Sequence, residues 1–188
     1  MIKKLEYIEK NHEYLLDGVL LPSITEILKV RFGKKYDYVD AETLKRASDK
    51  GTQLHKVIEQ YCMYGIESGL VELKNFKFLQ KMYQFKVVDN EIPVILYQDK
   101  KPIACGRLDL IIELDGKLGI ADIKRTSVLD KEYVCCQLNA YRLAYEQTYN
   151  RHIDFISAIH LREEKRKYIE LPINDTIIYE IYNEWKKQ

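Results

Sequence analysis

The stretch "GRLDLIIELDGKLGIADIKRT", residues 106–126, carries two apolar runs on either side of Asp115-Gly116. That dipeptide favours a two-residue type I′ turn, so the stretch predicts a β-hairpin. With this turn, counting back along both strands places Asp109 directly opposite Asp122. The two side chains would share one face, with Cβ atoms about 5 Å apart. Two acids therefore face each other inside an apolar hairpin, provided that no bulge shifts the register.

The two acids repel each other unless something neutralises them, because their neighbours on the same face are isoleucines. They can share a bound cation. Alternatively, they can form diagonal ion pairs with Arg107 and Lys124, which the same register places opposite each other. Buried ion pairs are a poor source of stability, since apolar residues usually serve as well or better. This consideration favours a functional site.

The spacing of Asp122 and Lys124 also bears on chemistry. Residues two apart on a strand project to the same face, whereas Ile123 between them points to the other side. The carbonyl oxygen of Ile123 can still reach a cation held by the acids. Two carboxylates and a carbonyl suit Mg²⁺ or Mn²⁺ rather than zinc. A lysine beside such an ion can orient or deprotonate a water, or stabilise charge on a phosphate, which outlines a phosphodiester-hydrolysis site.

The rest of the chain predicts helices around a sheet, in one domain spanning residues 1–188. The first half is expected to hold a short strand pair within 5–22 with turns at Lys10-Asn11 and Asp17-Gly18, a helix from Ser23, a helix over 40–65 that is interrupted or kinked near Gly51, with N-cap Asp40 and an end at Gly65, and a helix over 71–87 whose apolar residues include Phe85. The second half is expected to hold strands over 92–98, 101–114 and 117–126, a helix over 130–150, a strand pair over 152–161 and 165–173, and a helix over 174–188. This order is typical of an α/β or α+β fold with a central mixed β-sheet flanked by helices.

Composition narrows the class of protein only slightly. Of the 188 residues, 46% are hydrophobic and 31% charged, as in ordinary globular domains, and the net charge of +1 neither indicates nor excludes a nucleic-acid partner. We find no apolar signal segment and no apolar run long enough for a membrane span, so a cytoplasmic protein without a membrane partner is expected. The four cysteines have neither C-x-x-C nor zinc spacing and are expected to be reduced.

Several short motifs follow one another along the chain. They are "PSITEIL" at 22–28, "GTQLHKVIEQY" with His55, Gly106-x-x-Asp109, Asp122-x-Lys124, and Gln137-x-x-x-Tyr141. Together they resemble the PD-(D/E)XK nuclease superfamily and, within it, the RecB-like branch. "PSITEIL" resembles a segment of the phage-type exonucleases of that branch. The layout is also similar to that of the mitochondrial genome-maintenance exonuclease.

The resemblance implies a restriction-endonuclease-like core and a metal-dependent DNA nuclease. It implies that His55, Asp109, Asp122 and the Ile123 carbonyl bind Mg²⁺ or Mn²⁺. It also implies that Lys124 is the catalytic lysine, acting with the two acids. Apart from the resemblance, a lone histidine on a helix is more often a surface or core residue.

Further residues are candidates for contact with substrate. The resemblance implies that Gln137 and Tyr141 line the site, and their spacing places them on one helix face. Tyr141 also continues an apolar stripe, so core packing is the alternative. Arg107 flanks the acids and is a substrate-binding candidate. Thr126 could touch a phosphate, or could instead cap the helix expected from Asp130.

The expected activity is that of a DNA exonuclease in recombination, repair or phage DNA processing, with DNA and a recombination or annealing protein as candidate partners. The alternatives are a restriction-type endonuclease, a catalytically silent DNA-binding module of the same fold, and a purely structural charge cluster. No iron–sulfur cluster is expected, because relatives that carry one use three cysteines towards the C-terminus and none follows Cys136 here. The chain also contains no helicase P-loop.

Overall fold

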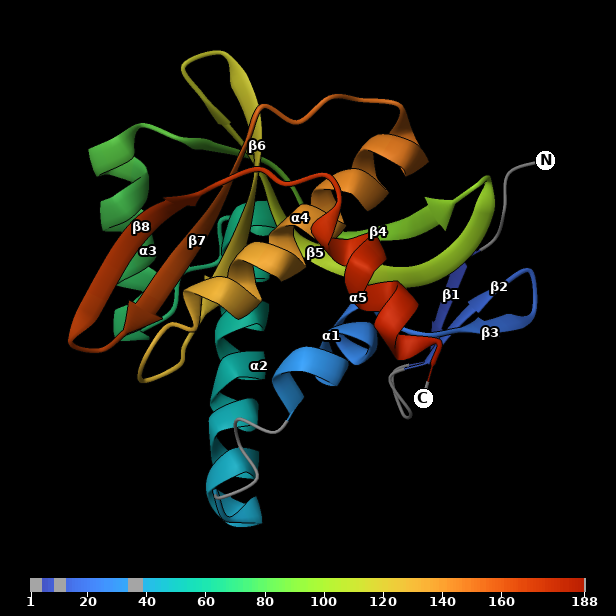
Figure 1. Ribbon diagram of the computed structural model, residues 1–188. Coiled ribbons are helices and arrows are strands. Elements are labelled where there is room, and N and C mark those ends of the chain that lie inside the picture. The colour runs from blue at the N-terminus through green and yellow to red at the C-terminus, as the bar shows by residue number, and fades with distance from the viewer. Residues whose placement is uncertain (1–4, 9–12, 34–38, 188) are drawn as a thin grey trace.

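The computed structural model describes residues 5–8, 13–33 and 39–187 (Figure 1). Its fold is mixed α/β, built on one five-stranded sheet in the order β4-β5-β6-β7-β8. The strands are β4 (Lys86–Gln98), β5 (Lys101–Leu114), β6 (Lys117–Lys124), β7 (Phe155–Arg162) and β8 (Lys165–Leu171). All neighbours are antiparallel except β6 and β7, which run parallel with a helix between them. The predicted central mixed sheet flanked by helices is confirmed.

Helices cover both faces of this sheet (Figure 1). They are α1 (Ile24–Phe32), α2 (Ala41–Tyr64), α3 (Val71–Tyr83), α4 (Lys131–Tyr149) and α5 (Ile177–Trp185). Alternate residues of each strand point to opposite faces, so the sheet contributes side chains to two hydrophobic cores, one on each face. Ile111 and Ile120 pack with α1, α4 and α5, whereas Leu110 and Ile123 pack with α2 and α3.

The hairpin of β5 and β6 forms as predicted. Both central residues of its turn have positive φ, 51° and 74°, as a type I′ turn requires. The register runs without a bulge from the pair Leu114↔Lys117 to the pair Leu110↔Ala121. Beyond that last pair, β5 continues beside β4 alone and β6 beside β7 alone. The sheet therefore opens at the level where the two acids were predicted to meet.

Helix α2 differs from its prediction in one respect. Its ends are as expected: Asp40 Oδ1 accepts a 2.8 Å hydrogen bond from the N–H of Thr43, and Gly65 ends the helix with φ of 67°. The predicted interruption near Gly51 is wrong, because the helix is continuous from Ala41 to Tyr64. A glycine inside a helix costs only about 1 kcal/mol. Packing of the long helix on the sheet outweighs that cost.

Two further boundaries differ from the sequence interpretation. Helix α3 ends at Tyr83, where Gln84 takes a left-handed φ of 59°, and β4 already begins at Lys86. The prediction of a helix to residue 87 and a strand only from 92 is therefore wrong. Phe85 keeps its predicted burial, but as the residue that leads from α3 into β4.

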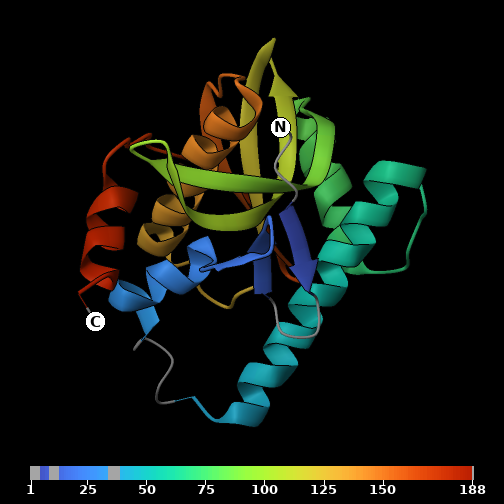
Figure 2. The same cartoon turned by 90° about the vertical axis from the view of Figure 1, so that its right-hand side faces the viewer.

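The N-terminal segment forms a second, three-stranded sheet. Its strands are β1 (Leu5–Ile8), β2 (Glu13–Leu16) and β3 (Val19–Leu21). This sheet packs on the β4–β5 hairpin through a small core of Leu16, Ile95 and Cys105 (Figure 2). The predicted turn at Asp17-Gly18 is present, whereas the one at Lys10-Asn11 lies outside the described residues. Three strands form here, where a strand pair was predicted.

Within the described part of the chain, the helices are all too short or too polar to cross a membrane.

Candidate active site

The site begins where β5 and β6 separate. Asp109 and Asp122 lie one position beyond the last pair of that ladder, Leu110↔Ala121. Asp109 Oδ2 accepts a 2.7 Å hydrogen bond from the N–H of Ile123. The carboxylate thus satisfies a backbone donor at the point where the strands part. One predicted ligand thereby fixes the backbone beside another.

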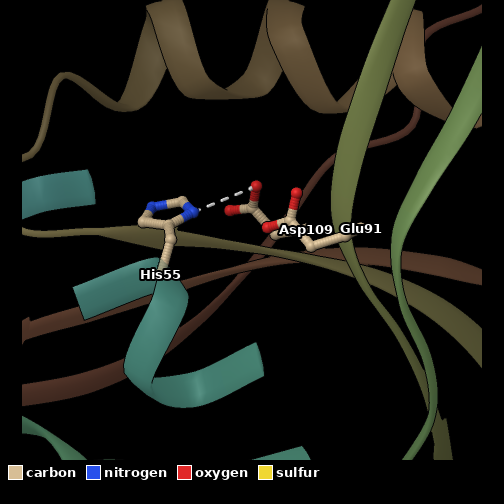
Figure 3. A group of neighbouring side chains, drawn as sticks. All are labelled: His55, Glu91 and Asp109. Carbon is tan, nitrogen blue, oxygen red and sulfur yellow. Dashed lines mark ion pairs between the residues drawn. The ribbon is translucent and has the colours of Figure 1, made fainter. Parts of the chain in front are cut away.

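Helix α2 brings His55 to this opening. Its Nε2 lies 3.0 Å from the carbonyl oxygen of Ile123, and its Nδ1 lies 3.4 Å from Asp109 Oδ1. Figure 3 shows the imidazole facing the Asp109 carboxylate. The side chain of His55 is 30% exposed. Three of the groups predicted to bind a cation therefore touch one another, although they come from α2, β5 and β6.

Asp122 and Lys124 form the other half of the site, on β6. The Lys124 ammonium nitrogen lies 2.6 Å from Asp122 Oδ2, and the Asp122 side chain is only 3% exposed. Among the described residues, no group makes a well-aligned hydrogen bond to that oxygen. Lys124 therefore pairs with Asp122 along its own strand, and not diagonally across the hairpin as the ion-pair alternative predicts.

Neither of the predicted diagonal ion pairs forms, because Asp109 does not pair with Lys124 and Asp122 does not pair with Arg107. His55 is the partner of Asp109 instead. Arg107 turns towards β4, where its Nε lies 2.7 Å from Glu91 Oε2. Its guanidinium lies over the ring of Tyr7, 5.0 Å from the centroid. The separation of the strands explains the difference, because Arg107 follows β5 towards β4 and no longer faces β6.

The carboxyl pKa values of the site show how its charges are balanced. Burial raises the pKa of Asp122 to about 6, with Lys124 opposing the rise and Asp109 adding to it. Burial also acts to raise the pKa of Asp109, but the neighbouring His55 outweighs it and the pKa lies below its ordinary value. One acid is thus held ionised by the imidazole, and the other is left close to protonation.

The pKa values of the two basic groups, His55 and Lys124, are both raised by the neighbouring acids. Burial acts to lower the pKa of His55, but attraction to Asp109 outweighs it and raises the pKa to about 9. Burial opposes the charge on Lys124 as well, and Asp122 and Asp109 together raise its pKa. At neutral pH the His55 imidazole therefore carries a proton. It occupies, as a cation, the space between a carboxylate and a carbonyl.

This donor set fits a hard divalent cation. Asp109, Asp122 and the Ile123 carbonyl offer oxygen, and His55 offers an imidazole nitrogen once a bound cation displaces its proton. Oxygen-rich sets of this kind suit Mg²⁺ and Mn²⁺. The side chains of Asp109 and Asp122 are only 13% and 3% exposed, and a bound cation would offset the cost of holding two acids together in this space.

Helix α4 closes the site with Gln137 and Tyr141, both buried. Burial raises the pKa of the Tyr141 hydroxyl well above 10, as do the nearby Asp109 and Asp122, and a hydrogen bond with Gln137 acts in the opposite direction. A Cβ on Gly106 would lie 2.6 Å from Tyr141 Cε1, so only glycine fits under the ring. Tyr141 also belongs to the core beneath α4. Tyr141 therefore both packs in the core and lies beside the acids of the site.

Thr126 is placed less favourably. Its side chain is exposed, and its carbonyl oxygen lies 2.6 Å from Nε2 of the buried His160. The predicted alternative, that Thr126 caps the following helix, is wrong. Asp130 is the N-cap of α4, and its Oδ1 accepts a 3.1 Å hydrogen bond from the N–H of Tyr133. Contact of Thr126 with substrate stays a prediction.

Sequence reasoning missed Glu91. Its side chain is 19% exposed, and one carboxylate oxygen lies within 4.8 Å of ligand atoms of both His55 and Asp109 (Figure 3). Burial and the charge of Asp109 both raise its pKa. A bulge opposite Leu96 and Tyr97, where Ile103 is the extra residue of β5, shifts the register so that Glu91 lies opposite Asp109. The only sequence signal was an acid at the start of an apolar strand.

Comparisons with known proteins do not identify a family. No family model and no curated protein matches the chain. Among solved structures, the crystal structure of SSO0001 matches with 16% sequence identity and a TM-score of 0.49. The match covers 88% of this chain and 75% of that one. This likeness is too distant to carry an argument about function.

Proposed function

We propose that the protein is a Mg²⁺- or Mn²⁺-dependent DNA nuclease of the PD-(D/E)XK type, RecB-like branch, acting as an exonuclease in recombination, repair or phage DNA processing. One observation carries the proposal. His55, Asp109 and the segment Asp122–Lys124 are far apart in sequence and meet at one opening of the sheet. Buried acids with perturbed pKa values in such a cluster are typical of functional sites.

The chain's own residues supply distinct parts of the chemistry. Asp109, Asp122, His55 and the Ile123 carbonyl would hold the cation, which when bound would supply Lewis-acid stabilisation to a phosphoryl oxygen. Lys124 stays protonated, because the acids raise its pKa. It therefore serves to stabilise negative charge and to orient a water rather than to remove a proton.

A pocket lined in part by Tyr133 offers space for a nucleotide. It has a volume of about 290 Å³ and lies between α1 and the start of α4, lined by Thr25, Lys29, Phe32, Gly33, Asp130 and Tyr133. Tyr133 is close enough to Lys124 to influence its pKa. Nucleic-acid bases stack on aromatic rings, and phosphates favour lysines. Thr25 belongs to the "PSITEIL" segment, the motif that favours an exonuclease over an endonuclease.

Digestion of end-labelled DNA tests the proposal. Linear and closed circular DNA are incubated with Mg²⁺, Mn²⁺ or EDTA. We expect cation-dependent loss of linear DNA only, with the label reporting polarity. Asp122→Asn should abolish it. Glu113→Gln, which removes an exposed acid from the same hairpin, should not.

The other outcomes separate the rival functions. Cutting of closed circles would indicate a restriction-type endonuclease. Salt-sensitive DNA binding without cleavage in any cation would indicate a binding module, because phosphate contacts displace counterions. A protein that neither cleaves nor binds DNA would overturn the proposal. The charge cluster would then have a structural role.

A further inference from the structure

Glu91 is held in an unusual position for a charged side chain. It lies in β4 with a positive φ of 52°, a backbone conformation that few residues other than glycine adopt. Its carboxylate is mostly buried beside Asp109, a second acid. Its visible compensation is the ion pair with Arg107, at 2.7 Å. A buried acid placed next to another acid needs a cation, and here Arg107 is that cation.

The carboxylate also faces the site. Ligand atoms of His55, Glu91 and Asp109 all lie within 4.8 Å of one another. Figure 3 shows the three side chains converging from α2, β4 and β5. Atoms bound to one Mg²⁺ at about 2.0–2.1 Å are separated by no more than roughly 4 Å. The three groups are therefore close enough to share an ion after small side-chain movements, and Asp122 lies in the same charge cluster.

Arg107 is placed so that it could leave Glu91 and bind another anion. Its side chain is 44% exposed, so part of the guanidinium faces solvent while Nε contacts Glu91. Its contact with the Tyr7 ring does not depend on Glu91 and would keep the guanidinium in place if the carboxylate turned away. An arginine held by an aromatic ring is suited to bind phosphate, because its planar guanidinium offers several donors.

We propose that Glu91 is a further ligand for a divalent cation at His55 and Asp109, and that cation binding draws Glu91 away from Arg107 and frees that arginine for a DNA phosphate. The cation and Arg107 then compete for one carboxylate. Cation loading and DNA binding become coupled, each strengthening the other. The cation part stands on the geometry alone, whereas the phosphate part rests on the proposed function.

If Arg107 and the cation compete for Glu91, substitutions of Glu91 and of Arg107 should change Mn²⁺ affinity in opposite directions. Mn²⁺ titration of the DNA-free protein measures both changes. Glu91→Gln removes a ligand and should weaken Mn²⁺ binding by about 10-fold or more. Arg107→Gln removes the competitor and should strengthen Mn²⁺ binding several-fold. Asp89→Asn is the matched control, because it removes an exposed charge from the same strand, and it should change little. A structural ion pair would instead make both variants bind less well or leave both unchanged.

The phosphate part is tested by DNA binding in a Lys124→Met background, which prevents cleavage. Mn²⁺ should raise DNA affinity when Arg107 is present, and Arg107→Gln should abolish most of that gain. Glu91→Gln should show raised DNA affinity without Mn²⁺, beyond the effect of Asp89→Asn. An equal gain from Mn²⁺ with and without Arg107 would overturn the coupling.

The same data separate this inference from the proposed function. Normal Mn²⁺ affinity in both Glu91→Gln and Arg107→Gln, together with Mn²⁺-dependent cleavage by the unmodified protein, would refute the role of Glu91 alone. Absence of Mn²⁺ binding and of cleavage in the unmodified protein would refute both.

Discussion

Lys124 and Arg125 are consecutive residues at the end of β6, yet they enter opposite sides of the sheet. Arg125 Nε donates a 2.7 Å hydrogen bond to Glu72 of α3, a fully buried acid. A more distant contact to Glu163 completes its surroundings. On this side one buried cation meets one buried acid, and together they join a helix to the end of a strand.

On the side of Lys124 the charges do not balance so simply. Asp109, Asp122 and Glu91 face two permanent cations, Lys124 and Arg107. Neutrality requires a proton on His55 or a cation from outside. The Arg125–Glu72 pair is balanced in charge, whereas this cluster holds an excess of acid that a titratable group or a ligand must offset. That difference separates a functional site from a buried ion pair in the same molecule.

The largest contrast is expected between Lys124→Met and Arg125→Met. Lys124→Met should reduce cleavage by about 10³-fold or more, because a charge aimed at the reacting phosphate is lost. Arg125→Met should keep most cleavage but lower the free energy of unfolding by about 3–5 kcal/mol, because Glu72 is left buried and unpaired. Cleavage rates measured below both melting temperatures, together with urea unfolding, check the two effects.

The control for this comparison removes both members of the structural pair. Glu72→Leu combined with Arg125→Met should recover much of the stability, since no buried charge is left unpaired. No second substitution at Asp122 should restore cleavage to Lys124→Met. Loss of cleavage in proportion to loss of stability in all variants would contradict the distinction between the two sides.

The next prediction concerns the proton on His55, in EDTA. Its folded pKa of about 9 lies above the 6.5 of the unfolded chain, so its stabilising effect is complete below pH 6.5 and is lost as pH rises through 9. The shift corresponds to at most about 3 kcal/mol. Because the side chain is 30% exposed, about 2 kcal/mol is expected. Urea unfolding of the protein and of His55→Gln between pH 6 and pH 10 measures it.

The difference in unfolding free energy between these two proteins should shrink across that pH range. A difference that stays constant would mean that His55 stabilises the fold through neutral contacts alone. His152→Gln is a suitable control, because that imidazole is highly exposed and lies away from the acids of the site.

Those parts of the site that depend on a turn and on strand register could be predicted from the sequence. The Asp115-Gly116 turn determines the β5–β6 register, and the register brings Asp109 and Asp122 to one level. His55 could be named only through the resemblance to a nuclease family, because no local rule places a residue of α2 beside Ile123.

Other features depend on irregularities that no local pattern encodes. The bulge between Leu96 and Tyr97 moves Glu91 opposite Asp109, and without it the acid would point to the other face. The parting of β5 from β6 turns Arg107 away from Lys124. The bulge and the separation of the strands both result from tertiary packing, and both change which charged side chains lie next to one another.

The smallest effect is expected from two glycines, one beside the site and one in the interior of α2. Gly106→Ala places a Cβ 2.6 Å from the Tyr141 ring, on the side of Lys124, so the ring must move. We expect a loss of about 1–2 kcal/mol of unfolding free energy from overpacking. Cleavage should also fall, because Tyr141 shifts beside the acids. Gly51→Ala meets nothing within 4 Å in α2 and should stabilise by about 0.5–1 kcal/mol without changing cleavage. Equal effects of the two substitutions on cleavage would show that the position of the Tyr141 ring does not matter for the chemistry.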